Sequence, residues 1–197
     1  MRGYKDFTCV KFSESEFTWG GSTFTGLLLD SGDTVPTNVS TTNVISSTSK
    51  NSGSGTQSHS FMSPDVFDVV SAIDGTAYGS FRLYVSVAST GTGSANVRIT
   101  SVDIKIEAID SDGNSRILSS NNVWTGTHLA NLNETKYLGI MYWFSVSKQE
   151  IAYNERLKLS IEYDWTRSDS LNQTSMTHGI TCSPVDRDIT LSIPFLV

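Results

Sequence analysis

The sequence predicts an all-β fold, an antiparallel β-sandwich of about eight strands, on the basis of three observations. Segments in which apolar and polar residues alternate recur along the chain, and such alternation places one face of a strand on a core. Thr, Val and Ile are frequent in these segments, whereas Ser, Gly and Asn fill the stretches between them. A single short segment has the periodicity of a helix. Jelly-roll and immunoglobulin-like connectivity both fit this pattern.

The first segment, residues 1–20, is predicted to be an N-terminal arm that holds one or two strands. Its apolar residues include Phe7, Cys9 and Phe12, and Gly20-Gly21 forms a turn after it. We expect residues 21–197 to form a single β-sandwich domain, because all-β domains of about 200 residues are common.

The next segment, residues 30–60, is rich in Ser and Thr and is predicted to be a long loop. Val39, Val44 and Ile45 are the side chains that can anchor its middle. A loop of this length in a compact domain is usually functional, interfacial or disordered.

The segment 63–75 permits two interpretations. Ser63 can cap a helix, Pro64 suits a first helical turn, and apolar residues recur at helical spacing as far as Gly75. Its β-branched content, Val69-Val70 above all, argues against a helix. At most one short helix is therefore expected, near residues 64–73.

Two strands with a turn between them follow. Residues 79–88 alternate cleanly. In residues 95–110 the apolar positions change from odd to even numbers at Thr100-Ser101, which predicts a β-bulge because a strand cannot change faces without an extra residue. The turn at residues 110–114 then leads into a hairpin.

The C-terminal third contains three further strands. Residues 137–146 are apolar at both odd and even positions, so we expect this strand to be covered on both faces and Trp143 to lie in the core. Residues 155–166 alternate cleanly. Residues 187–197 also alternate, and Pro194, which lacks an N–H, is expected at an edge or an unpaired position of a closing strand.

The composition disfavours several classes of partner. The formal net charge is −6, and Lys and Arg form no cluster, so neither nucleic acid nor an anionic membrane surface is expected to bind. No stretch approaches the roughly 18 apolar residues of a membrane span. The first residues lack the apolar region of a secretion signal, so we expect either a leader missing from this sequence or assembly inside a cell.

The two cysteines, Cys9 and Cys182, lie near opposite ends of the chain. One disulfide between them and two buried free thiols are both compatible with the sequence. The thiols are favoured, because free Cys often behaves as a small core residue.

Catalytic and metal motifs are not apparent. Asp110, Asp112 and Asn114 have the spacing of alternate ligands in some Ca²⁺ loops. An Asp-Gly hairpin turn with solvated carboxylates is favoured, because no Glu follows at position 121 and the flanking segments are strands. His59 and the two other histidines fall in polar segments and are expected to be solvated. The sequence therefore predicts a chain that is not an enzyme and needs no cofactor.

Exposed aromatic rings are the remaining candidate for a binding site. Trp124 lies in a polar segment, and Tyr84 lies on the polar side of its strand. Such rings stack on sugars, so these two residues form a candidate glycan-binding site.

A resemblance to a known class of proteins rests on the order of strands and turns: the strand at 79–87, the strand and turn at 102–114, and the strands at 154–162 and 191–195. This order resembles the β-sandwich, jelly-roll-like structural proteins of archaeal and bacterial viruses, over about residues 79–197. The resemblance implies a capsid, decoration, tail or fibre subunit located in the virion, with copies of itself and other virion proteins as partners in a homo-oligomer. A carbohydrate-binding module or adhesin at an extracellular surface, and a secreted filament subunit without its leader, are the alternatives.

If the chain assembles in this way, strand pairing between subunits would use an open strand edge. The N-terminal arm and the 30–60 segment are the parts we expect to cross between subunits. The predicted contact residues share an apolar character and lie in these two segments: Phe7, Cys9, Phe12, Val39, Val44 and Ile45.

Overall fold

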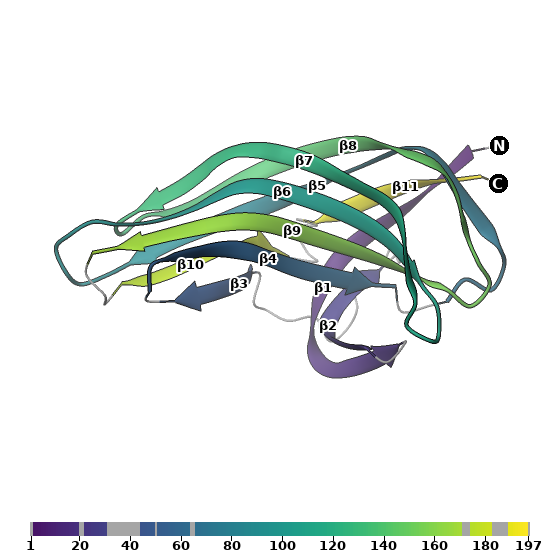
Figure 1. Cartoon of the computed structure of the whole chain (residues 1–197), viewed down its shortest axis with the longest axis horizontal. Helices are drawn as coiled ribbons and strands as arrows, with labels where there is room; N and C mark the ends of the chain where they lie inside the picture. The colour runs from purple at the N-terminus through teal and green to yellow at the C-terminus, as the bar shows by residue number, and fades with distance from the viewer. Residues whose placement is uncertain are drawn as a thin grey trace.

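In the computed structural model, the described residues form eleven β-strands, and the all-β prediction is confirmed (Figure 1). The structure describes residues 2–19, 22–30, 44–49, 51–63, 66–170, 174–182 and 189–196. In chain order the strands are β1 (Arg2–Trp19), β2 (Ser22–Asp30), β3 (Val44–Ser49), β4 (Gly53–Met62), β5 (Ser71–Ala88), β6 (Ala95–Ile109), β7 (Ser115–Asn131), β8 (Thr135–Ile151), β9 (Arg156–Asp169), β10 (Ser175–Thr181) and β11 (Thr190–Leu196). Among these residues no helix occurs that could cross a membrane.

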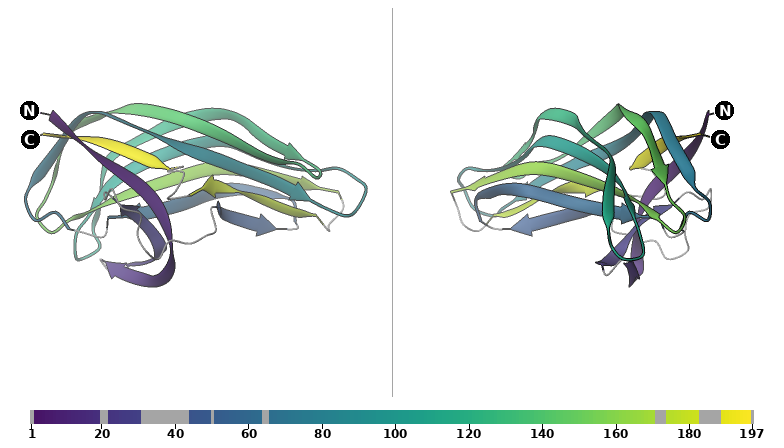
Figure 2. Two further views of the ribbon diagram at one scale, coloured as in Figure 1. Left: turned by 180° about the vertical axis from the view of Figure 1, so that it is seen from behind. Right: turned by 45° about the vertical axis from the view of Figure 1, so that its right-hand side comes forward.

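The strands form two facing layers joined by one hydrogen-bonded path. The path runs β3-β10-β5-β11-β1-β2-β4-β9-β6-β7, and β8 pairs with the other edge of β5. The half that contains β8, β5 and β10 packs on the half that contains β4, β9, β6 and β7 (Figures 1 and 2). Neighbouring strands are antiparallel, apart from one parallel bridge between β2 and β4. The two ends of the chain lie side by side, because Arg2 pairs with Leu196 (Figure 2).

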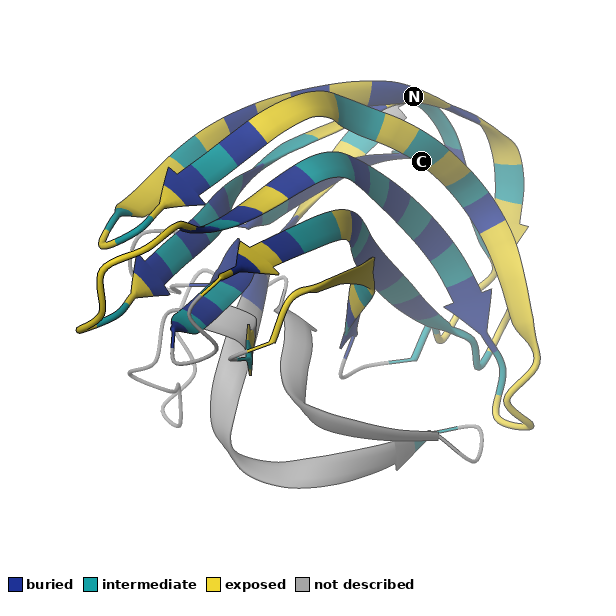
Figure 3. Ribbon diagram, turned by 60° about the vertical axis from the view of Figure 1, so that its left-hand side comes forward, coloured by how far each residue is buried: buried dark blue, intermediate teal, exposed yellow. Residues whose placement is uncertain are grey.

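The core lies between the two layers, and Figure 3 shows buried residues alternating with more exposed ones along strands such as β5, β6 and β9. Leu83 and Val85 from β5 meet Leu159 and Ile161 from β9 in one cluster of buried side chains. Each of these side chains is fully buried, and burial of one such side chain stabilises a fold by about 1.5–3 kcal/mol. Both strands were predicted from their alternation.

Two local predictions on the strands are confirmed. The pairing of β6 with β7 and with β9 shifts between Ile99 and Ser101, which is the predicted bulge. Pro194 lies where the pairing of β11 with β5 is interrupted, between Ser192 and Phe195. The interruption suits a residue without an N–H, and β11 closes the sheet between β5 and β1.

The middle of the chain contains more strand than the sequence predicts. β3 and most of β4 lie within residues 30–60, of which residues 31–43 and Lys50 fall outside the described residues. The helix that residues 63–75 could form is absent from the described part of that segment, since residues 66–70 are not helical and β5 begins at Ser71. The division of the chain at residue 20 stays a prediction, although β1 itself belongs to the sheet.

The two cysteines are buried thiols that form no disulfide with each other. The Cys182 thiol donates a hydrogen bond to the main-chain oxygen of Cys9 over 2.9 Å, which links the end of β10 to β1. Burial, and then the charge of the neighbouring Cys182, raises the pKa of Cys9 well above its usual range.

Candidate interaction surface

The outer face of β8 carries large side chains that the sequence predicts to be buried. Even-numbered residues of β8, such as Tyr142 and Phe144, face the core. Trp143, however, is 74% exposed and Met141 is 82% exposed. The prediction that this strand is covered on both faces and that Trp143 lies in the core is wrong. Only one face of β8 packs on the other layer, and apolar residues occur on the outer face as well.

The same outer face continues onto β5, which pairs with β8 along most of its length. Tyr78 lies directly opposite Trp143, and Tyr84 lies opposite Tyr137, with ring centroids 5.2 Å apart in the second pair. Tyr4 of β1 extends the face, because its ring lies 5.4 Å from that of Tyr78. We call this surface the aromatic face; its members are large, at least partly exposed side chains on three strands, namely Tyr4, Tyr78, Tyr84, Tyr137, Met141 and Trp143.

The middle of the aromatic face is open and nearly uncharged. Ser80 lies opposite Met141, and Arg82 lies opposite Gly139. A Cβ atom added to Gly139 would meet no atom within 4 Å, so the space above this position is open. Eight outward-facing residues lie between and including the Tyr78–Trp143 and Tyr84–Tyr137 pairs, and Arg82 is the one among them that carries a charge.

The two aromatic residues predicted to bind a glycan lie in different surroundings. Trp124 is half-buried on β7, where its indole lies against Gly126 and packs on the core. Tyr84 is half-buried on β5 and belongs to the aromatic face. A glycan site built from this pair stays a prediction.

The predicted subunit contacts are only partly described. Phe7 and Cys9 are buried in the core of this chain, on a strand that pairs with β11 and β2. The side chains of Phe12, Val44 and Ile45 lie outside the described residues, as does all of Val39. The main chain of Val44 and Ile45 pairs with β10 of the same chain. Contact of these six residues with a neighbouring subunit stays a prediction.

The acidic turn at residues 110–114 uses its oxygens internally. One carboxylate oxygen of Asp110 accepts hydrogen bonds from the main-chain N–H groups of Asp112 and Asn114, each over 2.9 Å. Its other oxygen accepts from the Asn114 side chain. These bonds lower the pKa of Asp110 and hold the turn, in which Gly113 has a φ of 88°. Among the described residues no group of three or more His, Cys, Asp or Glu side chains could hold a metal ion.

All three histidines lie in strands, contrary to the prediction that they are solvated loop residues. His59, His128 and His178 lie on β4, β7 and β10, and each is less than 9% exposed. The prediction failed because each histidine is flanked mainly by polar or small residues such as Ser, Thr and Gly, so that no apolar pattern around it reveals the strand. Hydrogen bonds make the burial of these polar rings possible.

His178 is the centre of a buried polar cluster between the two layers. Arg167 donates a hydrogen bond from Nη2 to His178 Nε2 over 2.5 Å, so the proton of the neutral ring lies on Nδ1. Nδ1 then donates to Tyr163 Oη over 3.2 Å, and His59 Nε2 lies 3.5 Å from that same oxygen. The ring of Trp165 stacks on His178, with centroids 4.5 Å apart.

This cluster keeps His178 neutral. Burial, followed by the positive charge of Arg167 and the nearby His59, lowers the pKa of His178 to about 3. Burial also lowers the pKa of Arg167 and raises that of Tyr163. The cluster is closed to solvent and joins β9, β4 and β10.

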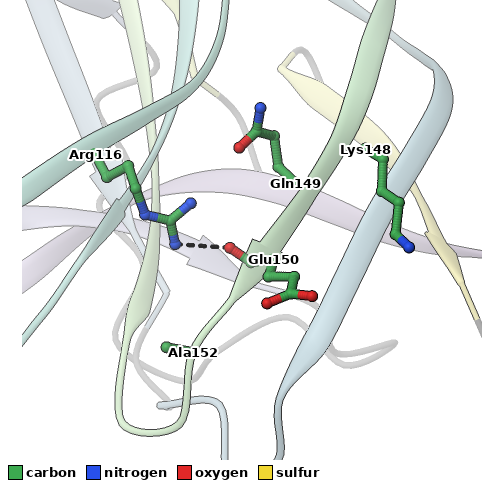
Figure 4. A pocket seen from close by; sticks show the side chains of 5 residues that line it. All are labelled: Arg116, Lys148, Gln149, Glu150 and Ala152. Atoms are coloured by element: carbon green, nitrogen blue, oxygen red, sulfur yellow. Dashed lines mark hydrogen bonds between the residues drawn. The ribbon is translucent and has the colours of Figure 1, made fainter.

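A hollow of about 440 Å³ lies where β7 begins and β8 ends (Figure 4). It is lined by Arg116, Lys148, Gln149, Glu150 and Ala152. The Arg116 guanidinium already donates to the main-chain oxygen of Glu150 over 2.6 Å and lies 2.9 Å from a Glu155 carboxylate oxygen. Because the guanidinium of Arg116 already forms hydrogen bonds within the chain, this hollow is a weaker candidate for a binding site than the aromatic face.

Comparisons with known proteins assign no family. No protein-family model and no curated protein match the sequence. An aminopeptidase from the marine sediment archaeon Thaumarchaeota archaeon is 8% identical, with a TM-score of 0.42, over 71% of this chain and 26% of that one. A CocE/NonD family hydrolase from Staphylococcus aureus is 12% identical, with a TM-score of 0.40, over 96% of this chain and 41% of that one. The chain thus spans less than half of these relatives.

Viral proteins are also among the similar structures. A chain in the structure of the infectious bursal disease virus Gx strain is 12% identical, with a TM-score of 0.25, over 99% of this chain and 55% of that one. The resemblance to viral β-sandwich proteins is therefore weak and does not single out viruses of archaea or bacteria. All three TM-scores are below 0.5, so none of these likenesses assigns a function.

The prediction that the chain is not an enzyme is corrected by these comparisons. Three of the similar structures are an aminopeptidase and two hydrolase structures. The absence of a recognisable catalytic motif in a sequence is not sufficient to exclude an enzyme, because catalytic residues can be contributed by distant parts of a chain.

Proposed function

We propose that this chain is a structural subunit of a self-assembling particle and that it contacts other subunits through the aromatic face. The observation that carries the proposal is the exposure of Trp143, Met141 and Tyr137, which are 74%, 82% and 56% exposed. Large contiguous apolar surfaces of this kind mark sites of interaction with another molecule.

The residue types favour a protein partner. Tyr, Trp, Met and Arg are enriched in protein interfaces, whereas Lys, Glu, Asp, Ser and Ala are depleted. The outward-facing row from Tyr78 and Trp143 to Tyr84 and Tyr137 consists mainly of the enriched types, and Ser80 is its one residue of a depleted type. Ser80 and Gly139 leave room for side chains of a partner.

The finer proposal is that the particle is a virion of an archaeal or bacterial virus, with the chain as a capsid, decoration, tail or fibre protein. Its support is the order of strands and turns over residues 79–197. Electron microscopy of the purified protein at high concentration tests this proposal: closed shells, rings or fibres are expected, and a uniform field of single subunits contradicts it.

The contact surface itself is tested by substitution. Light scattering across a concentration series is expected to show assembly of the wild-type protein and its loss in Trp143→Ser. The matched control is Ile117→Ser, which removes a 58% exposed apolar side chain from β7. Equal assembly of both variants and wild type contradicts a role for the aromatic face.

A glycan is the alternative ligand for this face, because exposed Trp and Tyr rings also stack on sugars. Met141, the most exposed large side chain of the face, has no flat ring and favours the protein partner. Glycan-array binding that Trp143→Ser abolishes in a protein that stays monomeric would replace the proposal with a carbohydrate-binding function.

A further inference from the structure

The aromatic face has an order of side chains that is approximately the same when read in either direction along the strands. An aromatic pair lies at each end, and two pairs that each combine a small residue with a long one lie between them. In order, the paired residues are Tyr78–Trp143, Ser80–Met141, Arg82–Gly139 and Tyr84–Tyr137. The two aromatic pairs are six positions apart along each strand, which corresponds to about 20 Å.

The middle of this row contains one side chain that projects from the sheet and one position with open space above it. Met141 is 82% exposed and stands out from the sheet. Gly139 is the next outward-facing residue of the same strand, and the space above it is empty of neighbouring atoms. A single chain therefore presents a long side chain and a gap two residues apart on one strand.

Based on the proposed assembly function, we infer that the partner of this face is a second copy of the chain, bound by the same face about a two-fold axis. With the axis across β8 at residue 140, β8 of one protomer lies antiparallel on β8 of the other. Met141 then enters the gap at Gly139 of the second copy, and Trp143 lies on Tyr137. Both contacts occur twice, as a two-fold interface requires.

The area and the charge of the face agree with this partner. If a large side chain exposes roughly 200 Å², the exposed parts of Tyr4, Tyr78, Tyr137, Met141 and Trp143 amount to about 600 Å². A standard interface buries about 800 Å² per partner, so this face is large enough for a small interface between two copies. The chain carries a net charge of −6, and a nearly uncharged face lets two such chains approach.

A substitution in the gap tests the fit without a loss of folding. Gly139→Glu fills a position where a Cβ atom meets nothing, and the new carboxylate lies opposite Arg82. Sedimentation equilibrium is expected to show a dimer at least tenfold weaker than wild type. Ser168→Glu, at an exposed position on β9 in the other layer, is the matched control and is expected to leave the dimer unchanged. Equal dimer affinity of wild type and Gly139→Glu overturns the inference.

Cysteine pairing tests the symmetry separately from assembly. Chains with Gly139→Cys and chains with Met141→Cys are mixed and treated with a short bismaleimide cross-linker, while Cys9 and Cys182 stay protected in the core. The linker can span the roughly 10 Å between facing sheets, which a direct disulfide cannot. A cross-linked heterodimer that forms faster than either homodimer supports the two-fold face-to-face contact. Assembly detected by light scattering without this heterodimer overturns the inference and leaves the proposed function intact. A monomer at every concentration contradicts both.

Discussion

Acidification is expected to destabilise the protein through His178, whose Nε2 accepts from Arg167 and whose ring stacks on Trp165. Below its ordinary pKa of 6.5 the histidine of the unfolded chain binds a proton, whereas the folded chain resists protonation down to a pH of about 3. The stabilisation is therefore complete above pH 6.5 and is lost as the pH falls from 6.5 toward 3.

The size of the effect follows from these two pKa values. Between the two, each pH unit costs about 1.4 kcal/mol of the free energy of unfolding, so lowering the pH from 7 to 5 costs about 2 kcal/mol. Other groups also contribute to the pH dependence of the free energy of unfolding of the wild-type protein, because burial lowers the pKa of His128 as well. The comparison must therefore be made against a variant that changes His178 alone.

His178→Gln is that variant, because the amide oxygen of Gln can accept from Arg167 and does not titrate. Urea unfolding followed by tryptophan fluorescence at pH 5, 6 and 7 gives the free energy of unfolding of both proteins. The stability difference between wild type and variant should shrink by about 2 kcal/mol from pH 7 to pH 5. His128→Gln is the control for loss of a different buried histidine. A difference that does not change with pH refutes the assignment of His178 as the acid-sensitive group.

Three further results are expected. Phe81→Ala removes a buried ring and should lower the free energy of unfolding by about 3–5 kcal/mol in urea titrations. Gly79→Ala should lower the melting temperature strongly, because the added Cβ would lie 2.1 Å from a main-chain oxygen of β11, whereas Gly139→Ala, with open space above it, should not. Cys9 and Cys182 should resist a thiol reagent in the folded protein and react together on unfolding, as followed by absorbance; rapid labelling of the native protein would show that they are accessible.

Strands with one solvent-exposed face and one buried face could be predicted from the sequence, and β9 is the clearest example. Leu157, Leu159 and Ile161 point to the core, and the predicted alternation is the observed one. The bulge near Ser101 could also be predicted, because a change of parity has one simple physical cause.

The aromatic face could not be predicted in full, because apolar residues on both sides of β8 resemble a strand covered twice. One signal does point to exposure: Ser145 and Ser147 continue the odd-numbered row of Trp143 and are themselves exposed. The place of Tyr84 on the polar side of β5 was a second, partial signal.

The buried histidine cluster was beyond sequence reasoning for a different reason. His59 and His178 lie 119 positions apart on strands with few apolar residues, and a third strand supplies Arg167. Only the pairing of β4 with β9 and the packing of the two layers bring these side chains together. Long-range pairing of polar strands leaves no local pattern to detect.

The position of β11 between β5 and β1 has a consequence for how the protein forms during synthesis. Ser192 bonds to Asp6 across a sequence separation of 186 residues, and β11 is made after the ten other strands. Until it leaves the ribosome, β1 and β5 each lack a neighbour, and their unpaired edges are open to other chains. Folding should therefore finish only after β11 has emerged. Pairing of β11 with β1 and β5 is expected to be slow, because the contacts are distant in sequence. The nascent chain is most prone to aggregation just before β11 emerges.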